Sequence, residues 1–145
     1  MKHIVKIFVP LILFSVLLTC KKDSSQSDVP NTLVDITIYL TEPQYTALNT
    51  VTNWAYVSGG VRGIFVYHSA PDAFVAIERN CTYQANNSSA IVSVDSSNTA
   101  HLKDASCGSK FYISDGSVAG APATVPLKRY QTSYNSSTFV LHIFN

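Results

Sequence analysis

Short apolar runs separated by turn-forming residues are the feature that most constrains the fold of this chain. In the clearest run, Leu33 to Leu40, every second residue is aliphatic, as in a strand with one buried face. Similar runs, rich in β-branched and aromatic residues, lie at 54–57, 64–67, 74–78, 90–95, 111–114, 127–134 and 138–144. Only residues 43–50 have the spacing of a helical turn or two. The sequence therefore predicts an all-β fold, an antiparallel sandwich or barrel.

The first twenty residues have the pattern of an export signal. Lys2 and Lys6 open an apolar stretch that ends at Cys20, and this stretch is shorter than the ~20 residues of a membrane-spanning helix. The leucine three residues before Cys20 resembles the lipobox of bacterial lipoproteins, in which the cysteine is acylated. We therefore expect a signal peptide at residues 1–19 and lipidation at Cys20. An ordinary cleaved signal with an incidental cysteine is the alternative.

Residues 20–31 are rich in Lys, Ser, Asp and Gln, a composition that does not bury enough surface to order itself. We expect a flexible tether there and one β domain at residues 32–145. The Lys21-Lys22-Asp23 start resembles charged signals that send some Bacteroidetes lipoproteins to the outside of the outer membrane. The predicted location is therefore the bacterial cell envelope, at the outer membrane. The domain can lie on either the periplasmic or the surface face of that membrane. The membrane itself is the first predicted partner, held through the acyl anchor.

The charge balance gives no reason to expect a nucleic-acid partner. Ten Lys and Arg residues face nine Asp and Glu residues, and two of these lysines belong to the leader, so the remainder has a balance of minus one. The eight tyrosines and Trp54 leave a sugar-binding surface open, although at strand spacing most of them are expected in the core. An envelope protein or a glycan is thus the other kind of partner that we consider.

The segment from Ser106 to Tyr130 reads SCGSKFYISDGSVAGAPATVPLKRY. It resembles the second half of a Rieske domain, in which a cluster loop (Cys, two residues, His, Gly, Ser, any residue, Phe) precedes an Asp-Gly turn, a Gly-Pro loop and a Pro-Leu strand ending in Tyr. The matching residues, in the same order and spacing, are Gly108, Ser109, Phe111, Asp115, Gly116, Val118, Gly120, Pro122, Pro126, Leu127 and Tyr130. The resemblance implies a Rieske-like fold of small antiparallel sheets with two loops at one tip.

The cluster-ligand positions depart from the Rieske pattern. A Rieske [2Fe–2S] cluster takes two thiolates and two imidazoles, in pairs from the two loops. Cys81 matches the cysteine of the first loop, but Tyr83 stands at its histidine. In the second loop, Asp104 stands at the cysteine and Cys107 at the histidine. Because phenolate and carboxylate are poor substitutes in such a site, we expect no cluster and no other cofactor, with a [2Fe–2S] cluster on atypical ligands as the alternative.

Cys81 and Cys107 would lie on adjacent loops in this fold, and in an exported protein we expect them to form a structural disulfide. A redox-active disulfide is one alternative. Another is a single metal ion held by the two cysteines with Asp104 and either Tyr83 or His101, although no tight ligand spacing supports a metal site.

No catalytic constellation is recognisable, and neither His68, His101 nor His142 neighbours a nucleophile in a known pattern. The sequence therefore favours a lipid-anchored, non-catalytic binding or structural module. The alternatives are an electron-transfer protein with an atypical cluster and a thiol-disulfide redox protein.

Overall fold

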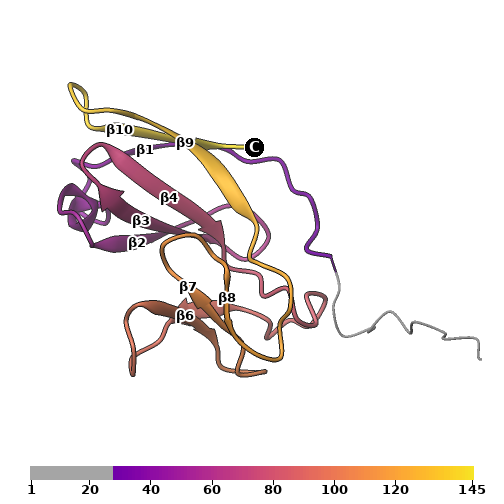
Figure 1. Cartoon of the computed structure of the whole chain (residues 1–145). Coiled ribbons are helices and arrows are strands. Elements are labelled where there is room, and N and C mark those ends of the chain that lie inside the picture. Colours follow the sequence, from indigo (N-terminus) through magenta and orange to yellow (C-terminus); the bar gives the residue numbers. More distant parts are fainter. Residues whose placement is uncertain (1–27) are drawn as a thin grey trace, which may run out of the picture.

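The computed structural model describes residues 28–145, which form antiparallel strands and one short 3-10 helix, η1 (Thr46–Asn49) (Figure 1). The strands are β1 (Asp35–Tyr39), β2 (Trp54–Val57), β3 (Ile64–Ala70), β4 (Ala73–Glu78), β5 (Val92–Val94), β6 (His101–Asp104), β7 (Lys110–Tyr112), β8 (Val118–Gly120), β9 (Arg129–Asn135) and β10 (Val140–Phe144). The all-β fold predicted from the sequence is confirmed. The predicted signal peptide, Cys20 and most of the predicted tether lie outside the described residues.

Six strands form the larger sheet, in the order β1-β10-β9-β4-β3-β2. Side chains from both ends of this sheet meet in one apolar cluster, the first core, to which β1 contributes Ile38, β2 contributes Val57 and β10 contributes Leu141. The sheet therefore curls around its own core. All strand pairs in it are antiparallel.

The remaining four strands form a smaller sheet, in the order β5-β6-β7-β8, which the chain builds between β4 and β9. This sheet lies beside one end of the larger one (Figure 1). Phe65 of β3 and Ile77 of β4 pack with Leu102 and Phe111 of the smaller sheet in a second apolar cluster, the second core. Strands β3 and β4 are thus buried on both faces, which explains why their sequences are almost continuously apolar.

Two strands of the smaller sheet, β6 and β8, were not anticipated from the sequence. β6 reads HLKD and β8 reads VAG, which are too short and too mixed to stand out as alternating runs. Pairing with β5 and β7 holds them in place. The segment 43–50, predicted to form a helical turn, contains η1. The described part of the chain contains no helix of the length and apolar character that crossing a membrane requires.

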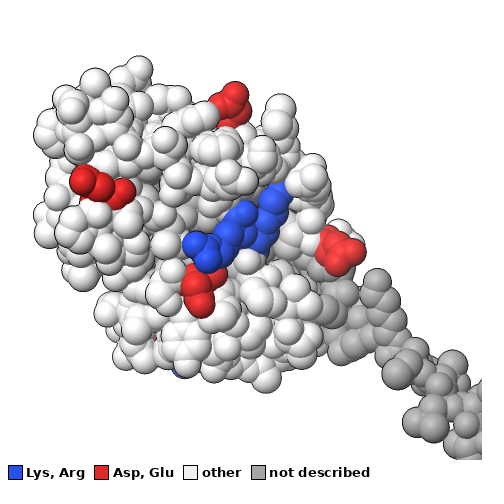
Figure 2. All heavy atoms as spheres, turned by 45° about the horizontal axis from the view of Figure 1, so that its top comes forward, with Lys and Arg blue, Asp and Glu red and all other residues white. Residues whose placement is uncertain are grey.

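Charged side chains are sparse on the face seen in Figure 2, where one short group of basic residues lies among separate acidic ones and uncharged residues form most of the surface. Larger apolar side chains are exposed singly on several elements, among them Tyr39 of β1, Tyr112 of β7 and Phe139 between β9 and β10. Scattered apolar residues of this kind are normal for a protein surface.

Candidate functional site

Three residues with metal-binding or redox chemistry meet at the smaller sheet. Cys81 follows β4, Asp104 ends β6 and Cys107 lies in the hairpin between β6 and β7. Their ligand atoms all lie within 4.8 Å of one another, and the two sulfurs are 4.0 Å apart. The two loops predicted to share one tip therefore do bring these three side chains together.

The two cysteines differ in their surroundings. Cys81 is fully buried in the second core, whereas Cys107 is partly exposed. Burial raises the pKa of the Cys81 thiol, with further increases from Asp104 and Cys107, although the backbone of Tyr83 acts in the opposite direction. Both cysteines are thiols in this structure, and a disulfide between them needs an approach of the sulfurs to about 2.0 Å. The disulfide stays a prediction.

Asp104 is fully buried, and only one of its two carboxylate oxygens forms hydrogen bonds within the hairpin. Its Oδ1 accepts hydrogen bonds from the backbone N of Ser106 at 2.7 Å and from the Ser106 hydroxyl at 2.6 Å. This is an Asx turn, in which the side chain caps the backbone two residues further on. The other oxygen, Oδ2, has no hydrogen-bond partner of ordinary distance and angle among the described residues, although a side-chain hydrogen bond with Asp104 contributes to the raised pKa of the Cys81 thiol. A buried carboxylate oxygen without a donor or a cation is costly, so its surroundings call for an explanation.

The same turn occurs at the other two hairpins of the smaller sheet. Asp95 binds Ser97 and Asp115 binds Ser117 in the same two-bond pattern. Asp115 is exposed to solvent, and Oδ2 of buried Asp95 lies 3.4 Å from Nζ of Lys110. The Asx turn thus explains why an aspartate stands at position 104. It does not explain why the second oxygen of Asp104 is buried, or why this carboxylate lies near two thiols.

The other residues considered for this site lie elsewhere. Tyr83, at the histidine position of the first loop, packs against the second core. His101 is not part of the three-residue group. Its ring packs against that of Tyr112, with 5.1 Å between centroids. Asp104 lies three residues further along β6, so its side chain points to the opposite face of the strand.

Two other histidines noted in the sequence are also remote from the thiols. His68 is buried and stacks on Phe74, and its ring nitrogens have no hydrogen-bond partner among the described residues. His142 pairs with Asp35 across β10 and β1, with 2.6 Å between Nε2 and Oδ1. We assign both histidines structural roles, His68 in packing against Phe74 and His142 in the ion pair with Asp35.

A [2Fe–2S] cluster of the Rieske type does not fit these residues. Such a cluster needs two imidazoles opposite two thiolates, and among the described residues the three-residue group contains no histidine. Two sulfurs 4.0 Å apart with a carboxylate beside them leave room for a sulfur–sulfur bond or for one metal ion.

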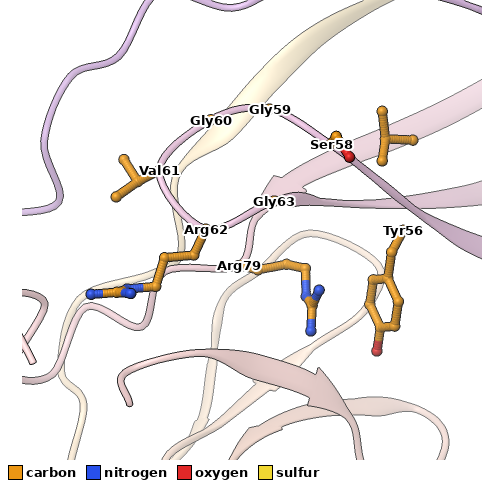
Figure 3. Close-up of a pocket in the computed structure, with 9 residues that line it drawn as sticks. Tyr56, Ser58, Gly59, Gly60, Val61, Arg62, Gly63 and Arg79 are labelled. Atoms are coloured by element: carbon orange, nitrogen blue, oxygen red, sulfur yellow. The ribbon is translucent and has the colours of Figure 1, made fainter. Parts of the chain in front are cut away.

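A pocket of about 450 Å³, separate from the three-residue group, lies under the loop between β2 and β3 (Figure 3). Arg62 and Arg79 line it, but both guanidinium groups are engaged. Arg62 donates to the carbonyl of Asn87 at 2.9 Å and to the side chain of Asn80. Arg79 lies over the ring of Tyr56 at 3.8 Å and also donates to residues 92 and 93 of β5. Arg79 therefore links the larger sheet to β5 of the smaller one, and Arg62 holds the segment between β4 and β5.

Sequence reasoning missed the residue that organises this loop, Glu78. Its side chain is fully buried at the end of β4, where it accepts hydrogen bonds from the backbone N of Val61 at 2.8 Å and of Arg62 at 2.9 Å. The Tyr130 hydroxyl also donates to it, at 2.7 Å. Burial and then Glu78 raise the pKa of Tyr130. A glutamate that follows an apolar strand is usually expected at the point where the chain reaches the surface. No sequence signal indicated that Glu78 is buried instead.

Neither a family model nor a curated protein matches this chain.

Proposed function

We propose that this chain is a lipid-anchored protein of the bacterial cell envelope, whose Rieske-like domain carries no [2Fe–2S] cluster and serves as a non-catalytic binding or structural module. Its expected contacts are the membrane, through acylated Cys20, and a second envelope component, either a protein or a glycan.

The observation that carries the proposal is the donor set at the loop tip. Cys81, Asp104 and Cys107 converge there, and the side chain at the fourth ligand position, Tyr83, packs into the second core. Cluster-based electron transfer needs imidazole ligands on one iron. With a carboxylate and a misplaced thiol instead, the tip is better suited to holding the two loops together than to carrying electrons.

Iron and acid-labile sulfide content test the proposal. The full chain would be produced in cells with active iron–sulfur assembly, extracted in detergent without oxygen, and compared with a cluster-containing Rieske protein made in the same cells. We expect neither iron nor sulfide in stoichiometric amount, and none of the visible absorption of the control protein. Two irons and two sulfides per chain would contradict the proposal and restore electron transfer.

A further inference from the structure

The three converging side chains have the geometry of a site for one tetrahedral ion. Two thiolates at about 2.3 Å from a tetrahedral zinc ion lie about 3.8 Å from each other. The sulfurs of Cys81 and Cys107 are 4.0 Å apart, and one carboxylate oxygen of Asp104 lies within 4.8 Å of both. One small ion therefore fits among the three groups with slight side-chain adjustment.

The free oxygen of Asp104 is an independent observation that points to a cation. Among the three Asp-x-Ser turns of the smaller sheet, Asp95 has Lys110 beside its second oxygen and Asp115 is exposed to solvent. Oδ2 of Asp104 is buried and has no hydrogen-bond partner among the described residues, and one oxygen of the same carboxylate lies within 4.8 Å of both sulfurs. A bound divalent cation would give this oxygen the partner that Lys110 gives Asp95.

The surroundings of Cys107 also suit a metal-bound thiolate. The backbone N of Ser109 donates to its sulfur at 3.5 Å, and the Cys107 thiol donates to the Ser109 hydroxyl oxygen at 3.0 Å. When a metal displaces the thiol proton, the Ser109 hydroxyl can donate to the sulfur instead, because its oxygen still accepts a hydrogen bond from the backbone N of Ala123 at 3.0 Å. Hydrogen bonds of this kind orient metal ligands and stabilise their charge.

We infer that Cys81, Asp104 and Cys107 bind one Zn²⁺ ion, with the fourth position open to water or to a donor atom of a partner. Two thiolates and one carboxylate are ligands that zinc prefers, and three protein ligands are typical of zinc sites that keep an open position. The inference rests on the proposed absence of a [2Fe–2S] cluster. It departs from the sequence-based expectation that no metal is bound, because the sequence did not reveal the buried oxygen of Asp104.

The predicted disulfide uses the same two sulfurs but does not account for the buried carboxylate of Asp104. A bond between Cys81 and Cys107 would leave Oδ2 of Asp104 buried without a partner, whereas an ion uses all three groups. Zinc binding keeps both sulfurs reduced, so the disulfide is expected only in chain that has lost its metal under oxidising conditions.

Metal analysis of the full chain, extracted in detergent with reductant present, tests the inference. We expect one zinc and no sulfide per chain. Replacement of the zinc by Co²⁺ should give the visible bands of a tetrahedral site with a thiolate charge-transfer band. Zinc should also protect Cys107, the partly exposed ligand, from alkylation, and a chelator should abolish the protection. These readouts use the unaltered chain, so they do not depend on whether a variant folds.

Variants then identify the ligands. Cys81→Ser, Cys107→Ser and Asp104→Asn should each lose stoichiometric zinc, whereas Asp95→Asn and Asp115→Asn, which alter the same kind of turn away from the thiols, should keep it. Asparagine preserves an Asx turn, so loss in Asp104→Asn alone would not reflect a broken hairpin. Ser109→Ala should weaken zinc binding about tenfold.

The possible failures are distinguishable. Stoichiometric iron with sulfide would overturn both this inference and the proposed function. A metal-free chain with a disulfide between Cys81 and Cys107, even when isolated with reductant, would overturn the zinc site and leave the proposed function standing. Full zinc retention by Asp104→Asn would overturn the three-ligand site.

Discussion

Glu78 has a fully buried carboxylate that accepts hydrogen bonds from three separate segments of the chain. Its donors are the backbone N of residues 61 and 62, the backbone N of Asn80 at 2.9 Å and the hydroxyl of Tyr130. A Cβ added at Gly60 would lie 2.2 Å from its Oε2, so the loop must approach the carboxylate as bare backbone. Glu78 therefore fixes the path of the loop between β2 and β3.

Replacing Glu78 by glutamine puts an NH₂ group where donors already point. We expect Glu78→Gln to lower the free energy of unfolding by about 2–4 kcal/mol, because hydrogen bonds to a buried charge are lost and donors are left without acceptors. Urea denaturation measures the change. Glu42→Gln is the control and should be nearly neutral, because Glu42 is partly exposed and its side chain accepts a surface hydrogen bond from the Gln44 amide. An equal loss in both variants would contradict this role of Glu78.

The Asx turn at Asp95 predicts acid sensitivity. The hydroxyl of Ser97, then its backbone N, and Lys110 lower the pKa of Asp95 to about 2, against about 3.9 in an unfolded chain. Between these pH values the unfolded state binds more protons, so this contribution to stability is complete above pH 4 and is lost as the pH falls through 2. Hydrogen bonds from Ser117 likewise lower the pKa of Asp115.

We therefore expect Asp95→Asn to make the fall in stability between pH 4 and pH 2 shallower than in the unaltered chain. Urea midpoints measured across that range give the comparison. Asp28→Asn, on the exposed N-terminal segment, should leave the slope unchanged. A slope identical in all three proteins would refute the turn as its source.

At the scale of elements, the strands that the sequence revealed have a clear apolar pattern, on one face or on both, and the strands that it missed do not. β1 alternates as expected, with Ile38 in the first core. β3 and β4 are recognisable by their apolar runs because each face meets a different core. β6 and β8 owe their conformation to neighbouring strands, and such tertiary pairing leaves too little pattern in three or four residues to be read in advance.

Strand β7 offers a matched pair of neighbouring residues on opposite faces. Phe111 is fully buried in the second core and Tyr112 is 45% exposed. We expect Phe111→Ala to cost about 3–5 kcal/mol of unfolding free energy, through lost burial and the cavity left behind. Tyr112→Ala should cost about 1 kcal/mol or less. Equal costs, measured by urea denaturation, would mean that β7 does not face the core as described.

At the scale of the whole molecule, we predict that the lipid anchor at Cys20 determines where the protein is located and does not affect the fold of the β domain. We expect Cys20→Ala in the full chain to abolish incorporation of labelled fatty acid and to move the protein from the membrane to the soluble fraction, because the acyl chains supply the membrane affinity. Cys81→Ala should keep the label, since that side chain is buried in the second core. A Cys20→Ala protein that still carries label would refute the lipidation site.

The sequence could predict which residues come together at the candidate site, but not that a carboxylate oxygen of Asp104 is buried there without a partner. The family-like spacing placed Cys81, Tyr83, Asp104 and Cys107 at one tip, and the structure brings three of these together. The repeated Asp-x-Ser pattern of the hairpins is readable in the sequence and could have identified the turn at Asp104. Which of its oxygens is used, and which is left buried, depends on packing between distant segments, and no local pattern encodes that.

The pairing of β1 with β10 has a consequence for the order in which the chain acquires its structure. Asp35 and His142, which form an ion pair diagonally across these strands, are 107 residues apart in sequence, and among the described strands β1 has no other neighbour in its sheet. If the chain is exported as we propose, it leaves the translocon with its N-terminus first, so β1 emerges early and its partner β10 emerges last. Contacts this distant in sequence form slowly, so β1 must wait with an unpaired edge, and this interval is when the chain most needs a chaperone.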